Sequence, residues 1–119
     1  MSTFKQEKSL EERKKETEKI MKKYDDRLPL IVERSPRTDL PEIDKKKYLV
    51  PNDLTIGQFM LTALRQRLKV TSEKALFIFV GENQIPPTAA TIKEVYDKYK
   101  DEDGFLYITY AGENTFGGI

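Results

Sequence analysis

The chain has 119 residues, of which 34% are charged, yet its formal net charge is only +1. This length allows one domain with a core of its own, and so small a net charge gives no electrostatic reason to expect a nucleic-acid partner. Cysteine and histidine are absent and no apolar run approaches the ~20 residues of a membrane span, so disulfides, thiolate nucleophiles and imidazole bases are excluded.

The first expected element is a helix near the N-terminus. Ser9 and Glu12 have the spacing of a capping box, in which the serine caps the helix and the glutamate reaches back. Side chains suited to a buried stripe then recur at helical spacing as far as Tyr24: Leu10, Thr17, Ile20 and Met21. A shorter helix is expected over residues 3–8. We therefore interpret residues 1–24 as a helical extension with a solvated outer face.

Two strands are expected next, over residues 28–34 and 45–51. Alternation divides the apolar side chains of the first strand between two faces, with Leu28, Leu30 and Val32 on one and Pro29 and Ile31 on the other. Both faces are apolar, so both need cover. Pro51 ends the second strand, and the lysines at its start are residues that protect an open sheet edge.

The second half of the chain predicts two helices and two strands. A well-packed helix is expected over residues 56–68, opened by a capping box that begins at Thr55. Residues 75–80 form a continuous apolar run, which is typical of a strand buried on both sides. A short helix begins near Ile92, and an aromatic and β-branched strand covers residues 105–110.

The order of elements over residues 25–110 predicts an α+β fold, a ubiquitin-like β-grasp in which a four-stranded mixed sheet holds one main helix. The main helix covers one face of this sheet. The N-terminal helix must cover the other face, and Ile20 is the side chain that we expect to do so. Because a short helix cannot seal a whole face, exposed apolar pockets are expected between this helix and the sheet, and such surfaces mark interaction sites.

Long segments of the sequence resemble the autophagy-related protein 8 family, which includes the GABA-receptor-associated protein and light chain 3 of microtubule-associated proteins. The resemblance extends over residues 4–117 and is carried by KKKYLVPNDLTIGQF (45–59), ALFIFV (75–80), IPPT (85–88), DGFLYITY (103–110) and GENTFG (112–117).

The chain departs from the family pattern at two places. Five residues separate Phe59 from Arg65 where the family pattern has four, and the loop at residues 81–84 is one residue longer. One added residue turns the remainder of a helix by ~100°. The departure therefore leaves open whether Arg65 and Arg67 keep the positions that the family gives them.

Residues 111–119 are mostly small or polar and have no periodic apolar pattern, so a flexible tail is expected there, and the resemblance implies that it serves processing and conjugation. In that family a cysteine protease cuts after a glycine that follows an aromatic residue. By resemblance the processing residues are Phe116, Gly117 and Gly118, and activating and conjugating enzymes then join Gly117 to the amine of phosphatidylethanolamine. Because residue 118 is also a glycine, cleavage after Gly118 stays an alternative. The lipid is attached covalently, and no other cofactor and no metal is expected.

The resemblance also implies docking of cargo receptors through aromatic-x-x-aliphatic motifs, which add a strand at the sheet edge, residues 47–51. The implied aromatic pocket comprises Glu16, Ile20, Pro29, Ile31, Lys47, Leu49 and Phe105. The implied aliphatic pocket comprises Tyr48, Val50, Pro51, Leu54 and Phe59. Acidic residues beside the peptide aromatic are expected to pair with Arg27, Lys46 and Lys47.

We therefore expect a ubiquitin-like modifier of autophagy that is not an enzyme, cytoplasmic when free and on the autophagosome membrane when lipidated. Its expected partners are a processing cysteine protease, the activating and conjugating enzymes, cargo receptors, and a membrane reached through the attached lipid, with no nucleic acid. The alternative is a non-conjugated adaptor for trafficking or microtubule partners, tubulin among them, that uses the basic N-terminal helix.

Overall fold

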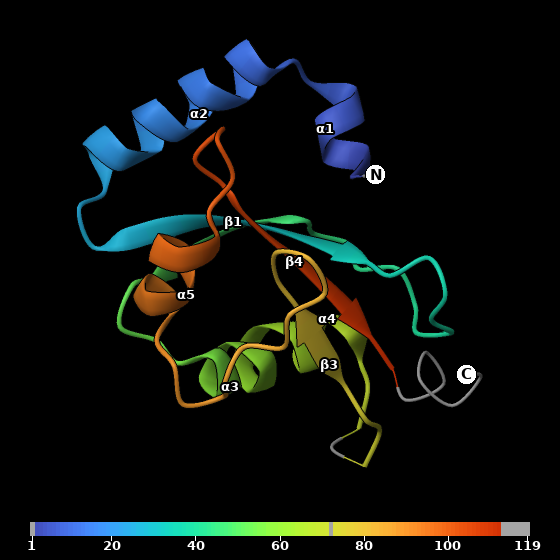
Figure 1. Ribbon diagram of the computed structural model, residues 1–119. Helices are drawn as coiled ribbons and strands as arrows, with labels where there is room; N and C mark the ends of the chain where they lie inside the picture. The colour runs from blue at the N-terminus through green and yellow to red at the C-terminus, as the bar shows by residue number, and fades with distance from the viewer. Residues whose placement is uncertain (1, 72, 113–119) are drawn as a thin grey trace.

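A four-stranded mixed sheet forms the centre of the computed structural model, which describes residues 2–71 and 73–112 (Figure 1). Its strands are β1 (Arg27–Arg34), β2 (Lys47–Pro51), β3 (Phe77–Phe79) and β4 (Leu106–Ala111). They lie in the order β2-β1-β4-β3, with β1 antiparallel to β2 and parallel to β4, and β3 antiparallel to β4. This is the α+β arrangement that the sequence predicts.

Helices cover both faces of the sheet (Figure 1). Over one face lie α1 (Thr3–Glu7) and α2 (Leu10–Lys23). Over the other lie α3 (Ile56–Phe59), the π-helical turn η1 (Met60–Leu64), α4 (Arg65–Leu68) and α5 (Ile92–Tyr99). The capping boxes predicted at Ser9 and Thr55 both form, which explains where α2 and α3 begin.

The main core fills the space between the sheet and α3, α4 and α5. The predicted alternation in β1 is confirmed, because Leu28, Leu30 and Val32 all belong to this core. Their buried partners are Tyr48 and Val50 of β2, Leu106, Ile108 and Tyr110 of β4, and Ile56, Phe59, Leu64, Leu68, Ile92, Val95 and Tyr96 of the helices. The apolar faces of the helices and of the sheet therefore pack together in one layer.

A smaller apolar cluster lies on the opposite face and is built around Phe4 of α1. The Phe4 ring packs edge-on against Phe105 with centroids 5.3 Å apart, and Ile31 completes the cluster. The expectation that Ile20 covers this face was wrong, because α2 turns Arg13 and Thr17 inward and leaves Ile20 only half-buried. Polar side chains on the inner face of α2 bind the turn before β4, beside the contacts that α2 makes with β1.

Strand β3 is shorter and less buried than the apolar run predicts. Ile78 is buried, but Phe77 and Phe79 on the opposite side of the strand are only half-buried. The expected burial on both sides was wrong because β3 lies at an edge of the sheet. Its alternate side chains therefore face the core and the surface in turn.

The extra residue in the main helix is absorbed by η1. The N–H of Arg65 donates to the carbonyl of Met60, five residues earlier, which is the hydrogen bond of a π turn. The Thr62 hydroxyl donates to the Gln58 carbonyl at 2.7 Å. Since the wider turn takes up one residue, the buried side of the helix continues through Leu68.

The two arginines after this turn are held in defined positions by contacts within the chain. Arg65 donates to the backbone carbonyls of Thr71 and Lys74 at 2.8 and 3.0 Å. Arg67 pairs with Asp44 at 3.2 Å. The remainder of the helix therefore keeps its face toward the core, and the rotation that a simple insertion would cause is avoided.

The last strand runs one residue further than predicted. Ala111 is fully buried and lies opposite Phe77, so the tail begins beyond it and not at residue 111. The processing and conjugation residues, 116–118, lie outside the described residues. None of the helices in residues 2–71 and 73–112 is long and apolar enough to cross a membrane.

Candidate functional site

The outer edge of β2 is the predicted docking edge, and it borders only one strand, β1, within the described sheet. The N–H of Val32 donates to the carbonyl of Lys46 at 2.7 Å. Bonded and non-bonded pairs alternate along an antiparallel ladder, so the backbone groups of Lys47 and Leu49 point away from β1. Leu49 lies opposite Pro29, which has no N–H to donate, in agreement with this register. The edge therefore offers main-chain groups to an added strand.

The predicted aromatic set lies on the α1/α2 face, but only part of it is accessible. The register sets Pro29 opposite Leu49 and Ile31 opposite Lys47, so these side chains share one face as predicted. Pro29, Ile31 and Phe105 are buried, whereas Glu16, Ile20, Lys47 and Leu49 are partly exposed. Ile31 and Phe105 are 0% exposed beneath Phe4, so a ligand cannot reach them while α1 is in place. Their role as the floor of a docking pocket stays a prediction, because Phe4 must move before a ligand can reach them.

An ion-pair bridge joins α2 to the docking edge. The Glu16 carboxylate accepts hydrogen bonds from Lys47 of β2 and, at 3.3 Å, from Lys8. Partial burial raises the pKa of Glu16, but the bonds from the two lysines outweigh burial and leave this pKa below its ordinary value. A carboxylate arriving on a peptide must therefore compete with Glu16 for Lys47.

The other two predicted cations also have partners within the chain. Arg27 donates to the carbonyl of Leu49 at 3.3 Å, beside the open edge. Lys46 donates to the hydroxyl of Thr3 at 2.9 Å. Pairing of these two side chains with acidic residues of a peptide stays a prediction. Each side chain would give up its hydrogen bond within the chain to bind a carboxylate of the peptide.

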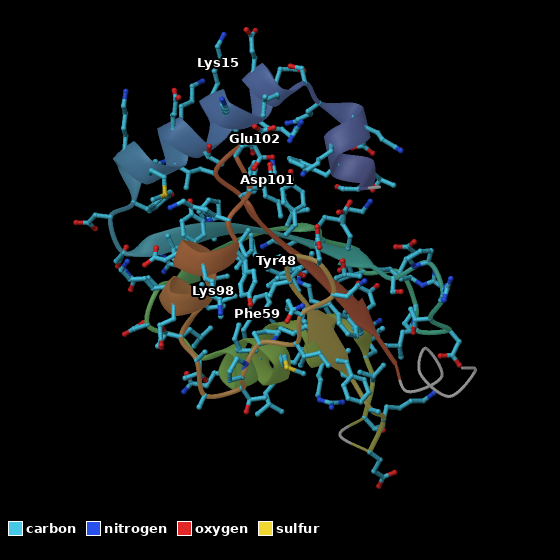
Figure 2. The ribbon with its side chains drawn as sticks, in the orientation of Figure 1. Lys15, Tyr48, Phe59, Lys98, Asp101 and Glu102 are labelled. Carbon is cyan, nitrogen blue, oxygen red and sulfur yellow. The ribbon has the colours of Figure 1, made fainter. Side chains whose placement is uncertain are left out.

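The predicted aliphatic set belongs largely to the main core. Tyr48, Val50 and Phe59 are 6%, 4% and 1% exposed, and Pro51 and Leu54 are partly exposed. The rings of Tyr48 and Phe59 meet edge-on at 5.7 Å (Figure 2). The expected pocket is therefore closed here. Within the described residues the Tyr48 hydroxyl has no hydrogen-bond partner, and burial raises its pKa to about 12.

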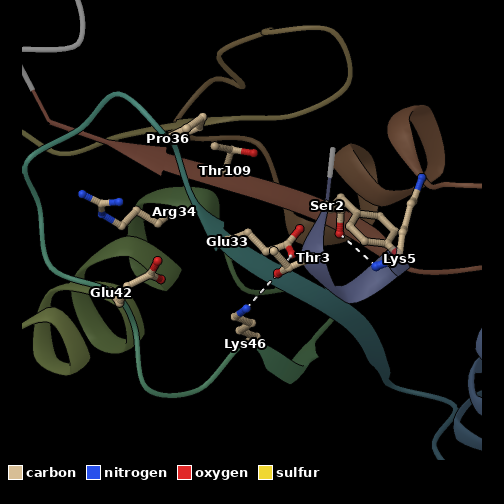
Figure 3. Close-up of a pocket in the computed structure, with 10 residues that line it drawn as sticks. Ser2, Thr3, Lys5, Glu33, Arg34, Pro36, Glu42, Lys46 and Thr109 are labelled. Atoms are coloured by element: carbon tan, nitrogen blue, oxygen red, sulfur yellow. Dashed lines mark hydrogen bonds between the residues drawn. The ribbon is translucent and has the colours of Figure 1, made fainter. Parts of the chain in front are cut away.

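A cavity of about 470 Å³ does lie between α1 and the sheet, and most of the residues that line it are polar or charged, although the surface they present to the cavity is largely apolar (Figure 3). Of the predicted peptide-binding residues, Lys46 is among those that line it. The Glu33 carboxylate at its wall accepts from the Thr3 hydroxyl at 2.9 Å and from the Phe4 N–H at 3.1 Å. Glu33 thus holds α1 in the position in which Phe4 covers the sheet. The expected pocket between the N-terminal extension and the sheet is therefore present, while Phe4 of α1 covers the adjoining apolar cluster.

A buried polar cluster, which the sequence pattern does not indicate, holds α2 over the sheet. The Asp103 carboxylate accepts from Arg13 at 2.6 Å, from the Tyr107 hydroxyl at 2.6 Å and from the Phe105 N–H at 2.8 Å. Thr17, one turn after Arg13 on α2, donates to the Asp103 carbonyl at 2.6 Å. Burial and the neighbouring carboxylate raise the pKa of Tyr107.

The close approach of Thr17 to the backbone of the same turn explains why residue 104 is a glycine. Its φ of +92° is a conformation that favours glycine, and a Cβ there would lie 2.6 Å from the Thr17 hydroxyl oxygen. Asp101 in the same turn also pairs with Lys5 of α1 at 2.5 Å, and Figure 2 shows Asp101 between α2 and the sheet. Both N-terminal helices are therefore tied to the turn that precedes β4.

The docking of α1 and α2 should weaken as the pH falls below about 5. Burial raises the pKa of Asp101, but the bond from Lys5 and further contacts lower it overall, as for Glu16. A carboxyl whose pKa is lower in the folded state stabilises it above the ordinary pKa near 4, and this contribution is lost as the pH falls through the lowered pKa. Because both carboxylates are partly exposed, we expect roughly 1 kcal/mol or less from each.

Thermal unfolding and amide exchange in residues 3–23, measured between pH 7 and pH 3, would check this pH dependence. The double variant Glu16→Gln, Asp101→Asn is the matched control, because it cannot titrate at these two sites. Its stability should change less over the same pH range. An equal loss in wild type and double variant would contradict the assignment.

Comparisons with known proteins agree with this fold. A family model described as "Autophagy protein Atg8 ubiquitin like" matches residues 12–117. Autophagy-related protein 8 of Dictyostelium discoideum is 56% identical over 98% of this chain and 95% of its own length. Autophagy-related protein 8c of Arabidopsis thaliana is 60% identical over 98% and 96%.

Two solved structures are similar over nearly the whole chain. The crystal structure of Trypanosoma brucei ATG8 has a TM-score of 0.88 at 42% identity and covers 95% of this chain and 96% of its own. Plasmodium falciparum Atg8, in complex with a Plasmodium falciparum Atg3 peptide, has a TM-score of 0.83 at 37% identity, over 94% and 99%. The ubiquitin-like architecture is thereby shown at the level of the backbone.

Proposed function

Because this chain belongs to the Atg8 family of ubiquitin-like autophagy proteins, we propose that it is a modifier that other enzymes process and join to phosphatidylethanolamine. The chain performs no reaction itself in this proposal. Without cysteine or histidine it can supply neither the thiolate nor the imidazole that such cleavage and transfer commonly use. It is the substrate, and Gly117 is the residue that becomes conjugated.

The open edge of β2 is the observation that best supports the proposed docking function. A receptor segment of the form aromatic-x-x-aliphatic adds a strand there and bonds to the outward backbone groups of Lys47 and Leu49. The partly exposed side chains of Ile20 and Leu49 then meet the aromatic residue. A short peptide held in this way binds with a dissociation constant of about 1 μM, or ~−8 kcal/mol.

Full burial of both peptide side chains requires movement in this chain. Phe4 lies over Ile31 and Phe105, and Tyr48 closes against Phe59. Displacing Phe4 from the sheet opens the first set, and separating Tyr48 from Phe59 opens the second. Docking in the proposal is therefore coupled to rearrangement, and part of the contact energy is used to open the two sites.

The peptide complex of the Plasmodium falciparum relative supports a further partner class. That relative is solved in complex with an Atg3 peptide, and we infer that a conjugating enzyme of this class is a partner here. Processing by a cysteine protease and activation by a second enzyme precede that step. After conjugation two acyl chains anchor the domain on the autophagosome membrane, each buried methylene contributing ~0.8 kcal/mol.

Conjugation on liposomes tests the proposal. The protein is incubated with the family's protease, activating enzyme, conjugating enzyme, ATP and phosphatidylethanolamine vesicles, and the product is identified by intact mass. Wild type should form the lipid adduct, Gly117→Ala should lose it, and Gly118→Ala is the matched control that should keep it. Loss only in Gly118→Ala would move the conjugated residue to 118.

Absence of any adduct from wild type, or an undiminished adduct from Gly117→Ala with Gly118→Ala unaffected, would contradict conjugation at this glycine. The mass of the protein recovered from cells gives an independent reading. An uncut, lipid-free mass in the membrane fraction would favour the non-conjugated adaptor instead.

A further inference from the structure

The backbone is tied down at the point where β4 ends. The N–H of Gly112, the last described residue, donates to the hydroxyl oxygen of Thr38 at 2.9 Å. The same oxygen accepts from the N–H of Leu40 at 3.3 Å. Thr38 is only 4% exposed and Gly112 is also buried, so water does not readily replace this bond.

The loop that carries Thr38 is itself fixed to the sheet. Arg34 donates to the carbonyls of Thr38 and Leu40 at 2.5 and 2.6 Å. The Tyr110 hydroxyl donates to the carbonyl of Pro41 at 2.6 Å, and the Tyr110 carbonyl accepts from Ser35 at 2.9 Å. Thr38 is therefore a rigid anchor whose position does not depend on the tail.

A cavity of about 460 Å³ adjoins this anchor. Asp39 and Leu40 line one part of it, Lys74 and Ala75 line another, and Gly112 is also at its wall. The side near Lys74 is held by Arg65, which donates to backbone carbonyls there. The tail therefore begins at the wall of a cavity, and hydrogen bonds from Arg34 and Arg65 hold the two loops that line it.

We propose that Thr38 is a positioning residue for processing of the tail: its bond to Gly112 sets the point at which the tail leaves the body. This inference rests on the proposed function. Gly117 lies five positions after Gly112, so the scissile bond can reach about 17 Å from the anchor. Without the bond the backbone of Gly112 is no longer held by the body of the protein. Ordering one more residue in a protease cleft then lowers the rate roughly five- to thirty-fold.

The reaction that the anchor serves is hydrolysis of the amide between Gly117 and Gly118. Water supplies the new oxygen, the carbonyl carbon of Gly117 becomes a carboxylate, and the C–N bond breaks. The segment that begins with Gly118 leaves with a protonated amine. Thr38 takes no part in these bonds and acts only through Gly112.

Kinetics of cleavage by the family's cysteine protease, on the full chain, test this role. Thr38→Val keeps the shape of the side chain but removes the hydroxyl, and Thr38→Ser keeps the hydroxyl. For Thr38→Val we expect kcat to fall five- to thirty-fold with KM within twofold, because the body still binds but the tail enters the cleft less often. Thr38→Ser should lie within twofold of wild type.

Two further measurements separate positioning from a loss of fold. Amide exchange at Gly112 should become at least tenfold faster in Thr38→Val and not in Thr38→Ser. Peptide binding at the β2 edge, across the sheet, should be unchanged. If the valine variant does not fold, Arg34→Lys loosens the same loop without changing Thr38 and should lower kcat in the same way.

Wild-type kcat in a folded Thr38→Val chain would overturn the inference, and so would unchanged exchange at Gly112. Failure of Thr38→Ser to restore kcat would do the same. A wild-type chain that is not cut after Gly117 would instead refute the proposed function, and the two failures are therefore distinguishable.

Discussion

Replacing Asp103 by alanine should lower the free energy of unfolding by about 3–5 kcal/mol, the largest stability effect that we expect from a single polar residue here. The change leaves the Arg13 charge without its 2.6 Å partner and removes the acceptor of the Tyr107 hydroxyl and the Phe105 N–H. Because the Asp103 side chain is fully buried, water cannot restore these contacts. Urea unfolding followed by circular dichroism measures the loss.

Asp101→Ala is the matched control, since it removes a neighbouring carboxylate that is partly exposed. Its pair with Lys5 should contribute about 1 kcal/mol or less. The double variant Arg13→Ala, Asp103→Ala should lose less than the sum of the single variants, because it leaves no unpaired buried charge. Equal losses for Asp103→Ala and Asp101→Ala would contradict the importance of the buried pair.

Leu49→Pro should abolish measurable docking at the β2 edge, or weaken it at least tenfold, while the chain still folds. The N–H of residue 49 points away from β1, so proline there removes no bond from the sheet, and edge strands tolerate such a residue. An added strand loses a donor and meets the pyrrolidine ring instead. Calorimetric titration with an aromatic-x-x-aliphatic peptide measures the effect.

Two variants of the same strand make this result specific. Leu49→Ala removes the side chain but keeps the N–H, and it should weaken binding by less than the proline does. Tyr48→Pro removes a backbone donor that points toward β1, and it should unfold the sheet. Equal binding losses in Leu49→Pro and Leu49→Ala would mean that side-chain contacts, and not strand addition, hold the peptide.

Local patterns in the sequence determined most elements and their faces. The capping boxes at Ser9 and Thr55 mark where two helices begin, because each satisfies backbone donors within four residues. The alternation of side chains along residues 28–32 assigns them to the two faces of the sheet, and this also depends only on residues close together in sequence. The lysines and proline of the second strand correctly indicated an open edge. The family resemblance added the candidate glycine and the candidate docking residues, which composition and periodicity alone do not supply.

The accessibility of those docking residues was decided only by tertiary structure. Phe4 covers Ile31 and Phe105, and Phe59 closes against Tyr48, so these predicted docking residues are buried in the free chain. The contacts of Phe4 join residues far apart in sequence, and no periodic pattern records which apolar side chain fills a given space.

The tertiary structure likewise decided how α2 is held and how the insertion is absorbed. Arg13 and Asp103 are 90 positions apart, and only their burial in one place turns two ordinary charged residues into a buried ion pair. The extra residue near Met60 forms a π turn because both ends of the helix are already anchored, by Phe59 in the core and by Arg65 on backbone carbonyls. Sequence determined which elements form and which faces they bury, because both depend on residues that are close together in the chain. Packing between elements that are distant in sequence determined which residues remain available to a partner.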